Sequence, residues 1–108
     1  MASSKGYLEF ILDQLSPLGD VKSRAMMGEY LIYYRGKIVG GIYDDRFLVK
    51  PTESARRLMP DAGYERPYDG AKEMLLAGNV DDSESLCRLI SEISDELPES
   101  GKARKSNK

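Results

Sequence analysis

Between residues 21 and 50 the sequence alternates apolar or aromatic with polar side chains, and short polar interruptions break this alternation. A period of two places successive side chains on opposite faces of a strand, and such short interruptions join antiparallel strands as hairpins. We predict four strands, in the first of which Val21, Ser23, Ala25 and Met27 share one face. The strands cover residues 21–27, 30–34, 38–43 and 47–49.

Two adjacent glycines, Gly40 and Gly41, lie inside the third predicted strand. Glycine weakens a regular strand because it has no side chain to pack and loses more conformational entropy. We therefore expect a β-bulge, or the close approach of a helix, at this point.

Helical periodicity flanks this strand region on both sides. Ser3 or Ser4 can cap a first helix, which Pro17 and Gly19 end, and Thr52 can cap a short second helix that Pro60 stops. Asp81 with Glu84 has the spacing of a capping box for a third helix. The apolar stripe of the first helix is Leu8, Ile11, Leu12 and Leu15, and that of the third is Leu86, Leu89, Ile90, Ile93 and Leu97.

Residues 62–70 read as an irregular aromatic stretch, and residues 74–77 as a last short strand. The predicted order is therefore α-β-β-β-β-α-β-α. This order is typical of a two-layer α+β fold, with a mostly antiparallel sheet and helices packed on one side. We expect one domain over residues 1–98 and a basic, disordered tail over residues 99–108.

Residues 24–30 read Arg-Ala-Met-Met-Gly-Glu-Tyr, an Arg-x-Met-x-Gly-x-Tyr opening that leads into the predicted strands. This segment resembles the signature of the TfoX/Sxy family N-terminal domain, and the similarity extends over roughly Tyr7 to Leu97. The resemblance implies an antiparallel sheet with helices on one side and a role like that of competence regulators, which act in DNA transformation. Family members with two domains add a C-terminal helical domain, so we expect this chain to be a stand-alone version.

The residue types in the chain argue against an enzyme. There is no histidine, which removes the usual general base and the commonest metal ligand. The single cysteine, Cys87, lies beside an apolar stripe and reads as structural. The acidic pairs Asp44-Asp45 and Asp81-Asp82 lie in turn or cap positions, where aspartate serves the backbone. We predict no catalytic residues, no cofactor and no metal site.

Charge is distributed unevenly along the chain. The net charge is −2, while the last eight residues carry four cations and no acid, so the rest of the chain carries −6. A domain with a net negative charge does not present the basic surface that nucleic-acid binding usually needs, so we expect any contact with nucleic acid to be weak. The sequence shows no signal peptide or membrane span, and one cysteine gives no disulfide, so we predict a cytoplasmic protein.

Tyrosines are the most numerous aromatic residues, seven against two phenylalanines and no tryptophan. Tyrosine suits half-wet contact surfaces because it combines a large rigid ring with a hydroxyl group. The alternative is that these are ordinary sheet tyrosines, with Lys and Arg protecting turns and edges. The candidate partner-contact residues are Arg24, Tyr30, Tyr33, Tyr34, Arg46, Lys50, Tyr64 and Tyr68.

Two roles are open for the Arg24 side chain: an ion pair with Glu29 across the bend, or contact with a partner. For the whole chain we predict a non-enzymatic regulatory or protein-interaction domain, with a protein partner and a homodimer as one option. A nucleic-acid-associated transcription regulator that uses basic strand ends and the tail is the alternative. A small carboxylate-dependent enzyme is the second alternative.

Overall fold

The computed structural model describes residues 4–78 and 80–97. It confirms the predicted α+β fold and the order of its elements, and adds a 3₁₀ turn, η1, and a short strand, β5. The elements are α1 (Lys5–Gln14), η1 (Ser16–Leu18), β1 (Val21–Met26), β2 (Glu29–Tyr34), β3 (Lys37–Tyr43), β4 (Arg46–Val49), α2 (Glu53–Leu58), β5 (Tyr64–Glu65), β6 (Met74–Leu76) and α3 (Ser83–Glu96). The tail expected over residues 99–108 lies outside the described residues.

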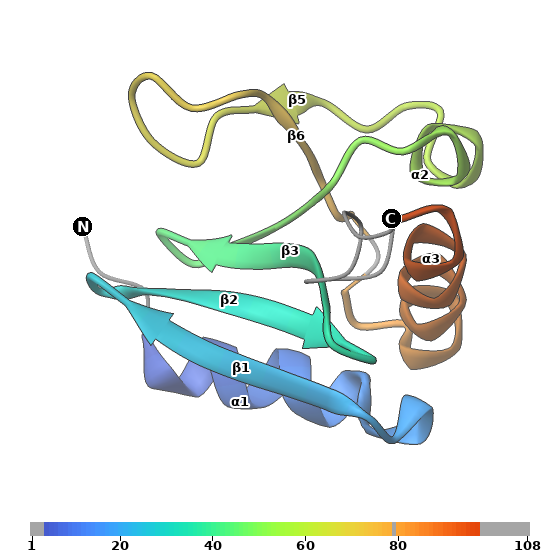
Figure 1. The fold of residues 1–108 in the computed structure, drawn as a ribbon, viewed down its shortest axis with the longest axis horizontal. Helices are drawn as coiled ribbons and strands as arrows, with labels where there is room; N and C mark the ends of the chain where they lie inside the picture. Colours follow the sequence, from blue (N-terminus) through green and yellow to red (C-terminus); the bar gives the residue numbers. More distant parts are fainter. Residues whose placement is uncertain (1–3, 79, 98–108) are drawn as a thin grey trace, which may run out of the picture.

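The strands form one antiparallel sheet in the order β1-β2-β3-β4-β6-β5 (Figure 1). Long β1 forms one edge, and β5, which contains two residues, forms the other. Strand β5 lies in the stretch that the sequence had indicated to be irregular. Two paired residues carry too little periodicity to be recognised in a sequence.

Three tight turns connect β1 to β4, and both central residues of each have positive φ, as in type I′ hairpins. The central pairs are Met27-Gly28, Arg35-Gly36 and Asp44-Asp45. The expectation that Met27 continues the first strand was wrong, because β1 ends at Met26 and Met27 turns the chain with φ 53°. Its side chain is 97% exposed.

The β2–β3 register shifts between Ile32 and Tyr33, so the irregularity lies beside Gly40 and not at the two glycines themselves, which pair with Ile32 and Leu31. Here β3 comes so close to β4 that a Cβ on Gly40 would collide with the Leu48 carbonyl oxygen and lie 3.0 Å from the Val49 Cα. Only glycine fits this approach without moving the backbone.

The core lies between the sheet and the helices, which pack on one face of it. Core residues of α1 and α3 meet alternate residues of the central strands, including Ile32, Ile42, Phe47 and Val49. Helix caps close the ends: Ser4 Oγ accepts from the Tyr7 N–H at 3.2 Å and Thr52 Oγ1 from the Ala55 N–H at 3.1 Å.

The third cap corrects the sequence prediction. Asp82, and not Asp81, is the N-cap of α3, and its Oδ1 accepts from the Ser85 N–H at 3.2 Å. Two adjacent aspartates offer the same capping chemistry, so the choice depends on where the helical turn begins.

Candidate interaction surface

The face of the sheet opposite the helices carries the residues that alternate with the core residues. On β1 these are Lys22, Arg24 and Met26, and on β2 they are Leu31 and Tyr33. Arg24 lies directly opposite Leu31, and Lys22 lies opposite Tyr33. Side chains of directly opposed residues share one face, so Lys22, Arg24, Leu31 and Tyr33 lie together on the open face of the first hairpin.

A shallow depression of about 610 Å³ lies at the start of this hairpin. Three cationic residues, Lys22, Arg24 and Arg35, line it beside Tyr33 and a single acid, Asp20. Among the described residues none of the three cations forms a salt bridge. The Arg35 guanidinium instead lies 5.7 Å from the centre of the Tyr34 ring. We call Lys22, Arg24, Tyr33 and Arg35 the basic patch.

The basic patch is a local exception in a chain with a net charge of −2. Cations without carboxylate partners keep their full attraction for an incoming anion, because no internal ion pair has to be broken. The patch can therefore hold carboxylates or phosphates of a partner.

The structure brings Arg24 and Tyr33 together in the patch and separates the other predicted contact residues. Tyr34 is 8% exposed and belongs to the core, and Tyr30 is half-buried against it. Lys50 is half-buried beyond the end of β4. The contact role of all eight residues stays a prediction.

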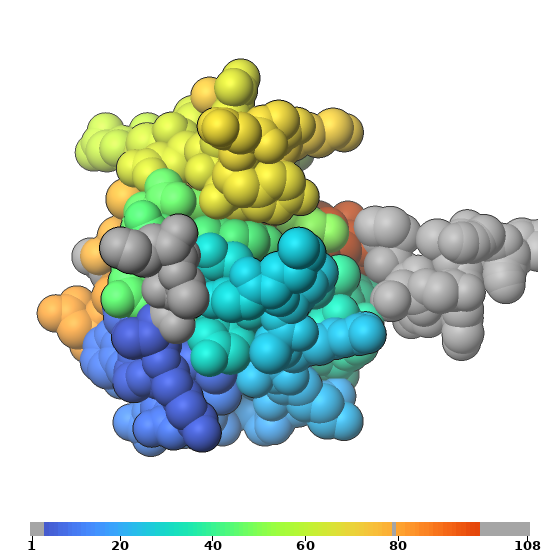
Figure 2. All heavy atoms as spheres, turned by 90° about the vertical axis from the view of Figure 1, so that its left-hand side faces the viewer, coloured from blue at the N-terminus to red at the C-terminus, as the bar shows by residue number. Residues whose placement is uncertain are grey.

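The remaining three lie toward the β5 edge of the sheet. Arg46 of β4 forms a salt bridge with Glu65 of β5. Tyr64 is half exposed, and Tyr68 packs on Tyr43 with their ring centres 6.4 Å apart. Figure 2 shows the segment around Tyr68 in yellow, above the β1–β2 turn in cyan. Burial, and with it the proximity of Tyr68 and Glu29, raises the pKa of the Tyr43 phenol.

Sequence reasoning left Lys22 out of the candidate set. The spacing in the sequence could have identified it, because Lys22 precedes Arg24 by two residues and a strand places residues two apart on the same face. Among the salt bridges between described residues, none joins Arg24 to Glu29, which the first of the two roles open for Arg24 would require. Glu29 Oε1 accepts a hydrogen bond from the Asp44 N–H at 3.1 Å, and so ties the first hairpin to the β3–β4 turn.

The acidic residues and Cys87 have structural contacts. Asp45 Oδ1 accepts a hydrogen bond from the Ser4 N–H at 2.7 Å, and Asp82 caps α3. Cys87 is half-buried, as predicted, with its Sγ 3.4 Å from the Gln14 carbonyl oxygen. Within residues 4–78 and 80–97 no group of three or more His, Cys, Asp or Glu residues could hold a metal ion.

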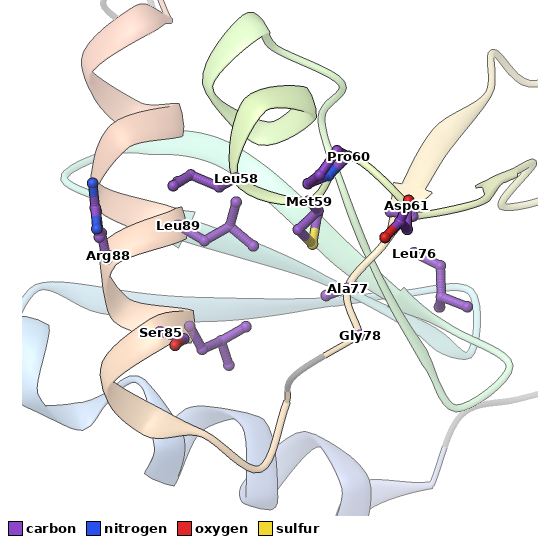
Figure 3. A pocket seen from close by; sticks show the side chains of 12 residues that line it. Leu58, Met59, Pro60, Asp61, Leu76, Ala77, Gly78, Ser85, Arg88 and Leu89 are labelled. Carbon is purple, nitrogen blue, oxygen red and sulfur yellow. The ribbon is translucent and has the colours of Figure 1, made fainter.

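A second hollow, of about 470 Å³, lies between α2, β6 and α3 (Figure 3). Leucine, methionine and alanine side chains form most of its wall, and Leu58, Leu76 and Leu89 are among them. Asp61 is the one carboxylate in the lining, and Figure 3 places it on the opposite side from Arg88. The described lining therefore holds no pair of carboxylates that could take separate acid and base roles.

These features define an α+β domain with an open, basic corner on its sheet. Residues 13–96 match the family model of the TfoX N-terminal domain, so the chain belongs to this family. It is 38% identical over 80 residues to an uncharacterized 12.7 kDa protein in the trpE 5′ region of Spirochaeta aurantia. That alignment covers 74% of this chain and 70% of the relative.

No solved structure matches the chain. In the part of the chain that the structure describes, no helix has the length and apolar character needed to cross a membrane.

Proposed function

We propose that this domain is a non-enzymatic regulatory module, related to the competence regulators, that acts in the cytoplasm through protein contacts. Membership of the TfoX N-terminal domain family supports a competence-regulator-like role. The observation that carries the contact role is the basic patch, where Lys22, Arg24 and Arg35 line one depression with Tyr33 and form no salt bridge among the described residues.

Nucleic-acid binding is the second candidate, and the same patch favours it. Three cations beside an aromatic ring suit a phosphate backbone with a stacked base. The net charge of the chain argues against it, because an acidic surface repels a polyanion over a distance comparable with the Debye length. Protein contact is therefore the first proposal.

Site-specific photo-crosslinking tests the proposal. A photoreactive residue in place of Tyr33 is expected to give a nuclease-resistant protein adduct in cells that carry the full chain. The same residue in place of exposed Glu84 on α3 serves as the matched control, and we expect no such adduct there. Equal adducts at both positions, or none, would contradict the proposal, and a nuclease-sensitive adduct at Tyr33 would favour the second candidate.

A further inference from the structure

Strand β1 is an open edge of the sheet. It lies at one end of the strand order (Figure 1), and every residue of it after Val21 is exposed. Natural proteins often block such edges with a proline, a covering element or charged side chains, because free backbone groups invite another strand. Strand β1 contains no proline, and no described strand pairs with its outer side.

The ladder register shows which backbone groups are free. Met26 and Glu29 flank the two-residue turn, and the Arg35 N–H donates to the Asp20 carbonyl at 3.1 Å. In an antiparallel ladder the residues that bond the neighbour alternate with residues that point away from it. Lys22 and Arg24 therefore bond β2. The N–H and C=O groups of Val21, Ser23 and Ala25 point outward.

The side chains of the edge indicate what kind of strand fits beside it. On the open face the edge presents Lys22, Arg24 and then Met26, which is 41% exposed. An added strand places its alternate side chains next to these three. Carboxylates match Lys22 and Arg24, and an apolar side chain matches Met26.

A second copy of this chain fits the edge less well. A two-fold antiparallel pairing centred on Ser23 would place Lys22 of each copy opposite Arg24 of the other. Four cations would then gather on one face, and like charges directly opposite each other destabilise a sheet. Charge complementarity favours an acidic strand instead.

We propose that β1 binds an extended, acidic segment of a partner protein by strand addition, with carboxylates at alternate positions beside Lys22 and Arg24. This deepens the proposed protein-contact function and rests on it. Backbone hydrogen bonds to Val21, Ser23 and Ala25 hold the segment, and the basic patch selects its charge. Exposed Met26 accepts an apolar residue at one end.

Amide hydrogen exchange by NMR on the full chain tests this, with a short capped peptide that alternates Glu with Thr as the probe. Exchange at Val21, Ser23 and Ala25 is expected to slow by at least about tenfold on saturation. Lys22 and Arg24 amides, already bonded to β2, are expected to change little. Absence of this alternating pattern at millimolar peptide would overturn the proposal, as would equal binding of a peptide in which Lys replaces Glu.

Ser23→Pro removes the central outward donor without removing a bond to β2, and proline is tolerated at such edge positions. We expect it to weaken peptide binding about tenfold, the equivalent of one lost hydrogen bond. Ser23→Ala keeps the donor and is expected to bind like the parent chain. If Ser23→Pro does not fold, the Lys22→Glu, Arg24→Glu double variant replaces it, and it should lose the Glu peptide and bind the Lys peptide.

Three further outcomes would overturn strand addition by an acidic segment. Duplex DNA that displaces the peptide and binds more tightly would assign the patch to nucleic acid. Protection of the three amides that rises with protein concentration alone would assign the edge to a second copy. A Tyr33 crosslink that persists unchanged in Ser23→Pro would keep the proposed function and remove this inference.

Discussion

The carboxylate of Glu96, near the end of α3, accepts a hydrogen bond from the Ser54 backbone N–H at 2.8 Å. Its other oxygen accepts from the Glu53 N–H at 3.1 Å. These donors lie in the first turn of α2, where backbone N–H groups have no partner inside the helix. Helix α2 contains only six residues, too few to be stable alone, so α3 supplies part of what holds it.

Removal of this carboxylate is expected to weaken the α2–α3 unit. Glu96→Ala should lower the free energy of unfolding by about 1 kcal/mol, similar to the loss of a helix cap. Asp95→Ala is the matched control on the adjacent exposed residue, and we expect it to change that free energy by less than about 0.5 kcal/mol. Urea denaturation measures both, and equal losses in the two variants would contradict the capping role.

The two glycines of β3 are expected to differ in their tolerance of a methyl group. In Gly40→Ala the new Cβ meets the Leu48 backbone, which cannot move without disturbing β4. In Gly41→Ala it meets the Tyr43 ring at about 2.7 Å, and a side chain can rotate away. Thermal unfolding should show a loss of about 3 kcal/mol for Gly40→Ala and a smaller loss for Gly41→Ala. The reverse order would contradict the close β3–β4 approach.

Met27 occupies a turn position that its side chain does not favour. A φ of 53° suits glycine, asparagine or aspartate, and the methionine side chain gains no burial there because it is 97% exposed. Met27→Asn should raise the free energy of unfolding by about 0.5 kcal/mol. The control is Met26→Asn within β1, where asparagine is unfavourable and a loss is expected. A loss of stability in Met27→Asn, measured by urea denaturation, would contradict the turn assignment.

Arg24 is expected to contribute little to the stability of the fold. It is exposed and has no salt-bridge partner among the described residues, while Glu29 bonds the Asp44 backbone. Arg24→Gln should therefore change the free energy of unfolding by less than about 0.5 kcal/mol. Glu29→Gln is the comparison, since it weakens the acceptor for the Asp44 N–H and should cost more. A large loss in Arg24→Gln, seen in a urea titration, would restore the ion-pair interpretation.

Periodicity predicted most of the fold, because burial enforces it. The stripe from Leu8 to Leu15 and the strands around Ile42 follow the periods of 3.6 and 2 that a one-sided core requires. Strand β5 could not be predicted, because two residues are too few to show a periodicity. The sequence could not show that Asp82, and not Asp81, caps α3, because the choice depends on the dihedral angles of a single residue.

The candidate surface could be predicted only in part. Alternation shows that Tyr33 and Tyr34 point to opposite faces, but it does not reveal which face the helices cover. The structure shows that Tyr34 faces the core. It also brings Arg35, from the turn after β2, next to Lys22 and Arg24 of β1. Such a cluster depends on strand register, which no local pattern specifies.

Alkaline pH should destabilise the protein through Tyr43, which is buried, and Tyr7, which is half-buried. Burial raises the pKa of the Tyr43 phenol above the ordinary 10.0. Burial also raises the pKa of the Tyr7 phenol, and the negative charge of Asp45 raises it further. The folded state therefore holds these protons more tightly than the unfolded state does. Stability that is fully present below pH 10.0 is lost as the pH rises through the higher pKa values of the folded state.

Substitution of these tyrosines isolates their contributions. Tyr43→Phe should reduce the fall in unfolding free energy above pH 10.0, and addition of Tyr7→Phe should reduce it further. Urea denaturation at a series of alkaline pH values measures the slope, and the parent chain at neutral pH gives the reference for any packing change. An unchanged slope in the double variant would show that other groups govern the alkaline loss, because a phenylalanine ring cannot ionise.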